Sequence, residues 1–479
     1  MYLGLDLGTS GLKGVVIDDA QTVVAEAVAP LSVSRPHPGW SEQDPAHWIA
    51  AAEEVLTRLG AATSLSAVRG IGLSGQMHGA TLLAADHEPL RPAILWNDTR
   101  SSAEASALDT IPMFRSISGN IVFPGFTAPK LVWVKANEPD VFGKTALVLL
   151  PKDMLRLWLT GEAVSEPSDA AGTSWLDTGE RTWSPELLGA CDMTVAQMPR
   201  LVEGSEVSGT LRDRIATRFG FSSGVVVAGG AGDNAGAAVG MGVVEEGQAF
   251  LSLGTSGVLF APSPGYNPAP ETSVHTFCHA LPGLWHQMGV ILAASDALSW
   301  HGQLLGADPV ALAADIGPLK APSQTIFLPY LGGERTPHND ARIRGAFVGL
   351  GHETDRVAAT RAVMEGVAFA VADCRDALEA AGTRVERAIA VGGGSRSRAW
   401  LEIMATALGI PIDVPGAGDY GAAFGAARLG QMAATGGGAE LATPPAIADT
   451  IEPDRELERA FSDAHDRFSA LYLALRGVR

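Results

Sequence analysis

The pentapeptide Leu-Gly-Thr-Ser-Gly occurs twice in this 479-residue chain, at Leu7–Gly11 and again at Leu253–Gly257, just past the middle. Each copy lies between two short apolar runs: Tyr2–Leu5 and Val15–Ile17 around the first, Ala249–Leu251 and Val258–Phe260 around the second. A glycine-rich turn between apolar runs is typical of a β-hairpin whose tip exposes backbone N–H groups and hydroxyls. Because the flanks match as well as the pentapeptide, we interpret the repeat as a duplicated domain.

The two copies differ in charge. Asp6 precedes the first turn and Lys13 follows it, whereas Ser252 and Leu259 stand at the equivalent positions of the second copy. A carboxylate and a cation therefore occur on one side only. The difference predicts two similar domains that are chemically unequal and face each other across a cleft, as an enzyme requires.

Helical patterns alternate with the strand-like runs, which predicts an α/β fold. The clearest are Ala46–Leu59, Thr354–Ala381 and Arg455–Leu475. The boundary between the domains is expected near Glu245–Gly247, which gives an N-terminal domain of residues 1–245 and a C-terminal domain of residues 246–479.

The composition narrows the class of protein. A hydrophobic content of 46% supports full-sized cores, and a formal charge of −19 disfavours nucleic acid as a partner. The cysteines are scattered without metal spacing, as in cytoplasmic proteins. Asp6 and Lys13 interrupt the first apolar stretch, which argues against a signal peptide, and Asp233 interrupts the long Gly/Ala/Val run, which argues against a membrane span.

Two glycine motifs resemble nucleotide loops. Gly143-Lys144-Thr145 lacks the earlier glycine of a P-loop, because Glu138 stands at that position. Gly416–Gly421 matches GxGxxG, but no acidic residue ends a following strand, so a tight turn for strand–helix packing is the better interpretation.

Asp233 and Asn234 follow the glycine-rich run Ala228–Gly232. An ionisable residue among such small residues can be approached closely by a ligand, and it can equally cap a helix. Phosphoryl transfer to an alcohol needs a carboxylate near the acceptor hydroxyl, and both roles are compatible.

Several motifs occur together and in order along nearly the whole chain. They are Leu5–Lys13, Ser34–Asp44, Gly75–Ala80, Trp96–Arg100, Gly125–Trp133, Gly229–Asn234, Gly332–His338 and Gly392–Trp400. This ordered set resembles the FGGY carbohydrate kinases. The resemblance implies two actin-like (ribonuclease-H-like) ATPase domains with ATP and sugar meeting in the cleft between them.

The resemblance also implies roles for individual residues. Asp233 would accept the proton of the sugar hydroxyl, and Asp6 would serve Mg²⁺, through water. The phosphates would be surrounded by Thr9, Ser10, Lys13, Gly254 and Thr255. The sugar would contact Met77, His78, Asp233 and Asn234, and the adenosine would contact Gly392, Gly393, Gly394 and Ser397. Relatives often carry Asn at the position aligned with Ser397.

The expected reaction is transfer of the γ-phosphoryl group of MgATP to D-xylulose, giving D-xylulose 5-phosphate. The alternatives are an FGGY kinase for L-ribulose, glycerol, gluconate or another polyol, a non-enzymatic actin-like ATPase, and a silent sugar sensor. We expect no nucleic-acid or membrane partner. The sequence leaves a homodimer open.

Other conspicuous residues favour structural roles. His275, Cys278 and His279 form a metal-like cluster without a fourth ligand nearby, so packing is favoured. Lys130 and Trp133 are also interpreted as structural, whereas Gly75 and Gly79 beside His78 favour ligand contact. The sequence allows two roles for Trp96–Arg100: it could bind sugar, or an Asp98–Arg100 pair could close a domain edge. For Glu334–Pro337 the sequence predicts only a turn.

Overall fold

The computed structural model describes residues 1–416 and 421–478. It divides into two compact units. Unit 1 comprises Met1–Val244, Phe277–Trp285 and Asp419–Pro444, and unit 2 comprises Glu245–Thr276, His286–Gly418 and Pro445–Arg479. The first break lies between Val244 and Glu245, one residue before the expected boundary. A single boundary at residue 245 does not account for the segment Asp419–Pro444, which belongs to unit 1 although it follows most of unit 2 in the chain. The turn predicted at 416–421 lies mostly outside the described residues.

The main sheet of unit 1 has the strand order β13-β14-β5-β1-β2-β3, with β15 beside β5. Its strands are β1 (Tyr2–Leu7), β2 (Gly11–Ile17), β3 (Val23–Pro30), β5 (Gly70–Gly75), β13 (Val207–Thr210), β14 (Val226–Ala228) and β15 (Ala231–Gly232). Short pairs lie beside it: β4 (Glu42–Gln43) with β7 (Ala93–Ile94), β6 (Thr81–Leu83) with β8 (Leu147–Leu149), β9 (Val164–Ser165) with β12 (Arg200–Leu201), and β10 (Leu176–Asp177) with β11 (Thr182–Trp183).

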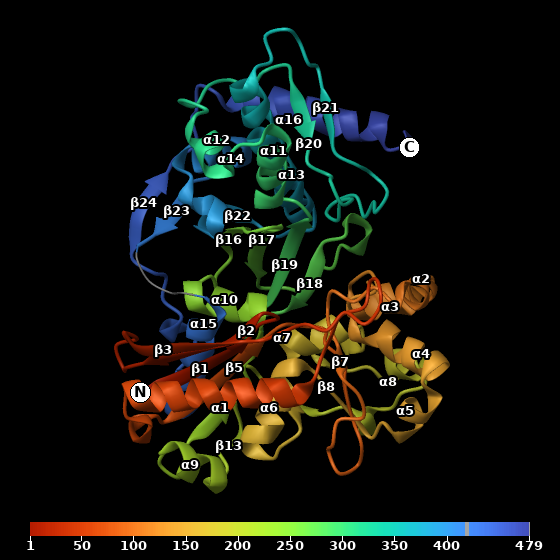
Figure 1. The fold of residues 1–479 in the computed structure, drawn as a ribbon, viewed down its shortest axis with the longest axis vertical. Helices are drawn as coiled ribbons and strands as arrows, with labels where there is room; N and C mark the ends of the chain where they lie inside the picture. The colour runs from red at the N-terminus through yellow and green to blue at the C-terminus, as the bar shows by residue number, and fades with distance from the viewer. Residues whose placement is uncertain (417–420, 479) are drawn as a thin grey trace. The chain divides into compact units, whose positions relative to one another are not determined.

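Helices cover both faces of this sheet (Figure 1). The helices of unit 1 are α1 (Pro45–Ala62), α2 (Ser102–Asp109), α3 (Pro112–Ser118), α4 (Thr127–Asn137), α5 (Pro139–Lys144), α6 (Pro151–Thr160), α7 (Pro167–Ala170), α8 (Pro185–Gly189), α9 (Asp213–Phe219), α10 (Asp233–Met241) and α15 (Ala422–Thr435), of which α1 and α15 pack on opposite faces of the main sheet. The late helix α15 packs directly on β1 and β5 because Gly4 and Gly72 have no side chain there. A Cβ at either glycine would lie 1.8 Å from a backbone oxygen of α15. This close packing explains why the segment belongs to unit 1.

The sheet of unit 2 has the order β18-β19-β17-β16-β22-β23-β24. Its strands are β16 (Gly247–Leu253), β17 (Gly257–Ser263), β18 (His275–Cys278), β19 (Trp285–Ile291), β22 (Val385–Val391), β23 (Ile412–Pro415) and β24 (Ile447–Ile451), and β20 (Ile326–Leu328) pairs separately with β21 (Ala346–Val348). The helices are α11 (Ser295–Leu305), α12 (Pro309–Ala314), α13 (Arg356–Ala380), α14 (Arg398–Leu408) and α16 (Glu458–Leu475). The long α13 lies almost wholly buried in the core, where the Trp400 indole of α14 donates to its Met364 carbonyl.

On one side of the hairpin the two sheets share the same spatial order and directions of strands, although β13 precedes β14 in the chain whereas β24 follows β23. In unit 1 the hairpin β1–β2 is followed by β5 parallel to β1, by β14 parallel to β5 and by the antiparallel β13. In unit 2 the hairpin β16–β17 is followed in the same order by β22, β23 and the antiparallel β24. This correspondence confirms the duplication, the α/β class and the predicted hairpins. The three predicted helices are also confirmed, as α1, α13 and α16.

None of the described helices is long and apolar enough to cross a membrane.

Candidate active site

The candidate site of unit 1 lies where three parallel strands end side by side. β1 and β15 both pair with β5, so that Asp6 and Ala231 are register partners of the same residue, Ser74. Ligands of open α/β sheets bind at this carboxyl edge of the strands. The chain beyond the three strand ends carries Thr9, Ser10, Met77, His78, Asp233 and Asn234, and the other two unit 1 residues predicted for metal and phosphate, Asp6 and Lys13, lie on β1 and β2.

Asp6 lies on β1 between Lys13 of β2 and Ser74 of β5. Its Oδ1 is buried and has no hydrogen-bond partner among the described residues. Burial, followed by the negative charge of Asp233, raises the pKa of Asp6 to about 7, against the opposing effects of the Ser74 hydroxyl and Lys13. A buried carboxylate oxygen without a donor is suited to a ligand that brings its own positive charge or water.

Asp233 is the first residue of α10, directly after the N-cap residue Gly232. The backbone N and the side-chain Nδ2 of Asn234 both donate to Asp233 Oδ1, at 2.7 and 2.9 Å. Burial raises the pKa of Asp233 to about 6, although these two hydrogen bonds oppose the shift. No described residue donates to Oδ2. One oxygen is thus fixed while the other remains available to a substrate hydroxyl.

Met77 packs its side chain against the turn that carries Asp233. A Cβ at Gly232 would lie 2.9 Å from Met77 Cγ, and one at Gly172 would lie 3.0 Å from Met77 Cε. Both glycines therefore let the Met77 side chain lie close to the backbone. Met77 is 6% exposed and forms an apolar wall beside the two carboxylates.

His78 has a left-handed backbone conformation with φ of 69°. Its ring stacks on Phe126 with the centroids 4.5 Å apart, and its Nδ1 lies 2.7 Å from the Gly172 carbonyl oxygen. Because a carbonyl can only accept, Nδ1 must donate, and in the neutral ring Nε2 is then an acceptor. The ring is therefore fixed in orientation and in tautomer.

The tip of the first hairpin is tied to the same region. Thr9 Oγ1 donates to Gln76 Oε1 at 3.0 Å and accepts from Trp96 Nε1 at 2.9 Å, while Gln43 Nε2 donates to the Thr9 carbonyl. Ser10 is exposed at the tip. Lys13 pairs with Glu26 at 3.3 Å. Of the predicted phosphate contacts in unit 1, the Thr9 hydroxyl is already engaged within the protein.

The predicted nucleotide residues of unit 2 also lie together. Gly392 follows β22 with φ of 91°, and a Cβ there would lie 2.9 Å from the Leu253 carbonyl group. Gly393 and Gly394 begin a 3₁₀ turn, Gly393–Arg396, after which Ser397 caps α14 by accepting from Trp400 N at 3.3 Å. The glycine turn thus packs directly against the second hairpin.

The second hairpin tip is held by the start of α11. The Gly254 carbonyl accepts from Ser295 N and the Thr255 carbonyl from Ala294 N, both at 2.9 Å. The carbonyl oxygens of Gly254 and Thr255 are therefore engaged within the protein, so a ligand at this tip would have to contact other groups, such as the backbone N–H groups and the hydroxyls of Thr255 and Ser256.

A cavity of about 610 Å³ lies beside this glycine turn. Its wall includes Gly393, Gly394 and Ser397 on one side and apolar residues of α11 and α12, such as Leu298 and Val310, on the other. Small-molecule sites usually have volumes of roughly 300–1,000 Å³ and apolar walls with a few polar groups. The cavity is therefore of a size and composition that suit a nucleoside.

Residues 1–240 match the N-terminal domain of the FGGY family of carbohydrate kinases, and residues 249–434 match its C-terminal domain. The chain belongs to the FGGY family of carbohydrate kinases. The family resemblance inferred from the motifs is therefore confirmed.

Individual FGGY relatives match over the whole length. The xylulose kinase of Escherichia coli strain K12 is 47% identical over 480 residues, which cover 99% of each chain. The crystal structure described as a "xyloylose kinase" from Brucella ovis superimposes with a TM-score of 0.99, at 60% identity and 100% coverage of both chains. The xylulose kinase from Rhodospirillum rubrum has a TM-score of 0.92 at 30% identity, covering 99% of this chain and 98% of that one. The predicted two-domain, actin-like sugar-kinase fold is confirmed.

The FGGY motif Gly125–Trp133 contains a lysine, Lys130, that holds the backbone of His78 in place. Lys130 is fully buried, and its Nζ donates to the carbonyl oxygens of His78 at 2.8 Å and Gly125 at 2.7 Å. Burial lowers the pKa of Lys130 well below its usual value. The structural interpretation of Lys130 is confirmed: it fixes the backbone that presents His78.

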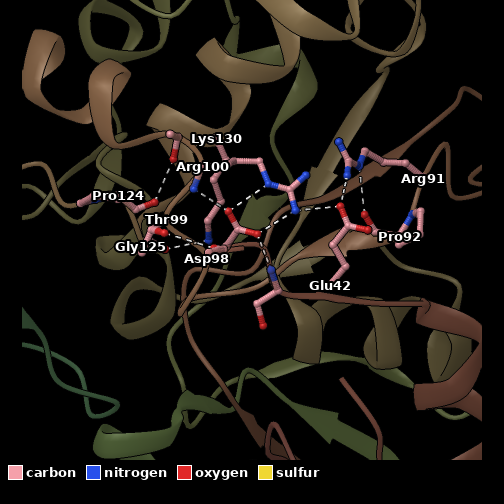
Figure 2. Close-up of polar contacts among 12 residues, drawn as sticks. Glu42, Arg91, Pro92, Asp98, Thr99, Arg100, Pro124, Gly125 and Lys130 are labelled. Atoms are coloured by element: carbon pink, nitrogen blue, oxygen red, sulfur yellow. Dashed lines mark hydrogen bonds and ion pairs between the residues drawn. The ribbon is translucent and has the colours of Figure 1, made fainter. Parts of the chain in front are cut away.

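The motif Trp96–Arg100 contains a buried ion pair between Asp98 and Arg100 (Figure 2). The Asp98 carboxylate accepts two hydrogen bonds from Arg100, from Nε at 2.9 Å and from Nη2 at 2.7 Å, and a third from Ser41 N at 2.6 Å. Arg100 also pairs with Glu42 at 2.8 Å and lies 3.6 Å from the centroid of the Trp40 ring. Asp98 and Arg100 therefore close this edge of unit 1, as one of the two alternatives predicts. Trp96 is 47% exposed beside Thr9.

The turn Glu334–Pro337 has a structural function that the sequence does not reveal. Glu334 Oε1 accepts from Leu292 N at 2.9 Å, and Thr336 Oγ1 accepts from Val290 N at 3.1 Å. Burial raises the pKa of Glu334 to about 8. The turn thus binds the end of β19.

Metal-binding groups are sparse in the described part of the chain. No three or more His, Cys, Asp or Glu residues there are arranged to hold a metal ion. The packing role predicted for His279 is supported, since the ring is fully buried with a pKa lowered by burial to about 3. Mg²⁺ commonly binds through one or two carboxylates, with water and phosphate oxygens completing its shell. Asp6, with its unpartnered oxygen, fits that mode.

Some residues of both sites carry no sequence signal. Gln76 lies inside the motif Gly75–Ala80, but nothing in the sequence indicates that its side chain contacts Thr9. The cavity residues Leu298 and Val310 are ordinary apolar residues of amphipathic helices. Ser168 and Gly172 approach Gly232 and His78 from a distant part of the chain, which only the tertiary structure brings near.

Proposed function

We propose that this chain transfers the γ-phosphoryl group of MgATP to the 5-hydroxyl of D-xylulose, giving D-xylulose 5-phosphate and ADP. The observation that carries the proposal is the convergence of Asp6, Asp233 and His78 at the ends of three adjacent parallel strands. The choice of D-xylulose rests on similarity to xylulose kinases that match almost the entire chain.

Asp233 is the proposed base. Its Oδ1 is held by Asn234, so the carboxylate has a defined orientation toward the acceptor hydroxyl. A pKa of about 6 leaves it mostly ionised at neutral pH yet more basic than an ordinary carboxylate, which suits acceptance of a hydroxyl proton. A base of this kind contributes roughly 10²–10⁴-fold to the rate, whereas positioning of the reactants contributes up to ~7–11 kcal/mol. Orientation of Asp233 should therefore matter as much as its basicity.

Met77 and His78 are the proposed sugar contacts. The fixed tautomer of His78 presents Nε2 as an acceptor for a sugar hydroxyl, and Met77 supplies an apolar surface. Asp6 is the proposed residue for Mg²⁺, which would neutralise charge on the phosphate oxygens.

The nucleotide is assigned to unit 2. Gly392, Gly393 and Gly394 offer a turn without side chains, and the adjoining cavity of about 610 Å³ is large enough for adenosine. Ser397 lines the same cavity, although its hydroxyl is engaged with Trp400 N. Gly254 and Thr255 are the proposed phosphate contacts on this side, with Thr9, Ser10 and Lys13 on unit 1.

The experiment is release of ADP from MgATP with a panel of acceptors: D-xylulose, L-xylulose, L-ribulose, D-ribulose, glycerol and gluconate. We expect kcat/KM for D-xylulose to exceed the others at least tenfold. Preference for another member would retain the kinase and reject D-xylulose. Bound ATP without turnover on any member would favour an actin-like ATPase that is not a sugar kinase. A homodimer and a cytoplasmic location remain predictions.

A further inference from the structure

Five charged side chains of unit 1 lie together and are completely shielded from solvent. Lys152, Asp153 and Arg156 lie on α6, and Glu166 and Asp169 lie at the start of α7 and within it; all five side chains are 0% exposed. Lys152 Nζ lies 2.9 Å from Asp153, 3.0 Å from Asp169 and 3.4 Å from Glu166. We call these five residues the buried charge cluster. Burying so many charges is costly unless each charge is paired with an opposite charge or hydrogen-bonded.

The cluster holds the turn before Asp233 at both ends. Arg156 donates to the carbonyl oxygens of Ala228 and Gly229, where β14 ends. The Glu166 carboxylate caps α7 by accepting from Ser168 N at 2.7 Å and Asp169 N at 3.0 Å.

At the other end of the turn, Ser168 Oγ accepts from Gly232 N at 3.1 Å. Gly232 is the N-cap residue of α10, and Asp233 follows it directly. The position of Asp233 therefore depends on a chain of contacts that begins in the buried charge cluster.

The same segment also reaches the proposed sugar contacts. α7 continues into a 3₁₀ turn, Ala171–Thr173, and the Gly172 carbonyl accepts from His78 Nδ1 at 2.7 Å. A Cβ at Gly172 would lie 2.4 Å from His78 Nδ1 and 3.0 Å from Met77 Cε. Ser168, which contacts Gly232, and Gly172, which contacts His78, are only four positions apart in the chain.

We propose that the segment Glu166–Gly172, fixed by the buried charge cluster, is a positioning device that sets Asp233 and His78 relative to each other. Ser168 and Gly172 are its two positioning residues, and neither takes part in the chemistry itself. The proposal rests on the proposed function, because it assigns Asp233 and His78 to one reaction.

The charge balance of the cluster agrees with a rigid role. Three carboxylates face two cations, and burial raises the pKa of Asp169 well above its usual value. Lys152 contacts all three carboxylates and Arg156 contacts Asp153, so every charge of the cluster has a partner of opposite sign.

Substitution of two serines tests the Asp233 end. Ser168→Ala removes the acceptor of Gly232 N, whereas Ser165→Ala removes a hydroxyl that is equally buried but has no hydrogen-bond partner among the described residues. We expect Ser168→Ala to lower kcat about 10- to 100-fold with the KM of both substrates changed less than about twofold, since misplacement of a reacting group acts on the rate. Ser165→Ala should leave kcat within about twofold of wild type. Equal kcat in the two variants would overturn the positioning role of Ser168.

Gly172→Ala tests the sugar end. The new methyl group would displace the His78 ring and the Met77 side chain, so we expect the KM for the sugar to rise about tenfold while the dissociation constant for ATP stays unchanged. An unchanged KM for the sugar in a folded variant would overturn the positioning role of Gly172. Thermal unfolding of each variant shows whether it is folded at the assay temperature, and losses that follow the unfolded fraction count against the proposal.

These outcomes are separable from failure of the proposed function. Wild-type protein that phosphorylates none of the sugars would reject the proposed function, and this role with it. An active wild type with unaffected variants would reject the positioning role alone.

Discussion

The two hairpins that share the pentapeptide Leu-Gly-Thr-Ser-Gly pair their strands in different registers. In unit 1, Asp6 is the partner of Lys13 and Leu7 of Leu12. In unit 2, Leu253 is the partner of Gly257, the residue equivalent to Gly11 rather than to Leu12. The pairing is therefore shifted by one residue between two turns of identical sequence. Flanking strands and neighbouring elements, not the five turn residues, decide how each hairpin closes.

The shift changes what each hairpin can do. The first register places a cation opposite the Asp6 carboxylate, on a strand whose neighbour leads to Met77 and His78. The second places Val258 opposite Ser252 and packs the Leu253 carbonyl group against the glycine turn at Gly392. The first hairpin thus carries an acidic and a basic side chain opposite each other, whereas the second makes a close backbone contact with the glycine turn. This difference predicts that unit 1 carries the reacting groups and that unit 2 carries the surface for the nucleotide.

Asp233→Asn is the strongest test of unit 1 as the reacting side. The amide cannot accept the hydroxyl proton, so we expect kcat to fall about 10³-fold or more while ATP binding stays within about twofold. Turnover with D-xylulose and calorimetric titration of ATP measure the two quantities. Retention of more than about a tenth of wild-type kcat would show that Asp233 is not the base.

Asp6→Ser makes the first hairpin resemble the second, where Ser252 occupies the equivalent position. Loss of the carboxylate proposed for Mg²⁺ should lower kcat about 100-fold and raise the Mg²⁺ concentration needed for half-maximal rate. The matched control is Ser252→Ala, which should leave both values close to wild type. Similar losses in the two variants would contradict the inequality of the hairpins.

The pH dependence should also originate in unit 1. Asp233 must be ionised to act as a base, and its pKa is raised from 3.8 to about 6. Activity should therefore be full above pH 7 and fall about tenfold for each unit below pH 6, where the carboxyl group is protonated. The measurement is kcat/KM from pH 4.5 to 8 at saturating Mg²⁺. A profile that is flat down to pH 5 would place the pKa near that of an ordinary carboxylate and remove the electrostatic argument for Asp233.

Much of this arrangement could be predicted from sequence, because the repeat and the ordered motifs are local signals. Apolar runs around Gly-Thr-Ser-Gly predict hairpins, and the resemblance carried by the ordered motifs implies that Met77, His78 and Asp233 serve one site. The register shift could not be predicted, since both turns have the same five residues. The assignment of α15 to unit 1 depends on Gly4 and Gly72, whose importance appears only when a helix passes over them.

The buried charge cluster is the least predictable part of the site. Lys152, Asp153 and Arg156 are charged residues close together in one helix, a pattern that normally indicates a solvent-exposed face. Their burial follows from partners that are distant in sequence, Glu166 and Asp169, and from the backbone of Gly229. No local pattern reports such contacts.

Gly393→Ala is the mildest substitution that tests whether unit 1 and unit 2 have different functions. A Cβ there would meet no protein atom within 4 Å, so the fold should be unaffected, but the methyl group would enter the cavity assigned to adenosine. We expect the KM for ATP to rise about five- to tenfold, with the KM for the sugar and the pH profile unchanged, since one misplaced methyl group in a binding pocket costs at least about 1 kcal/mol. Gly143→Ala is the control, because a Cβ at that surface glycine also meets nothing and lies outside both sites. A rise in the sugar KM instead would assign the glycine turn to the sugar, and the contrast between a reacting unit 1 and a nucleotide-binding unit 2 would have to be reversed.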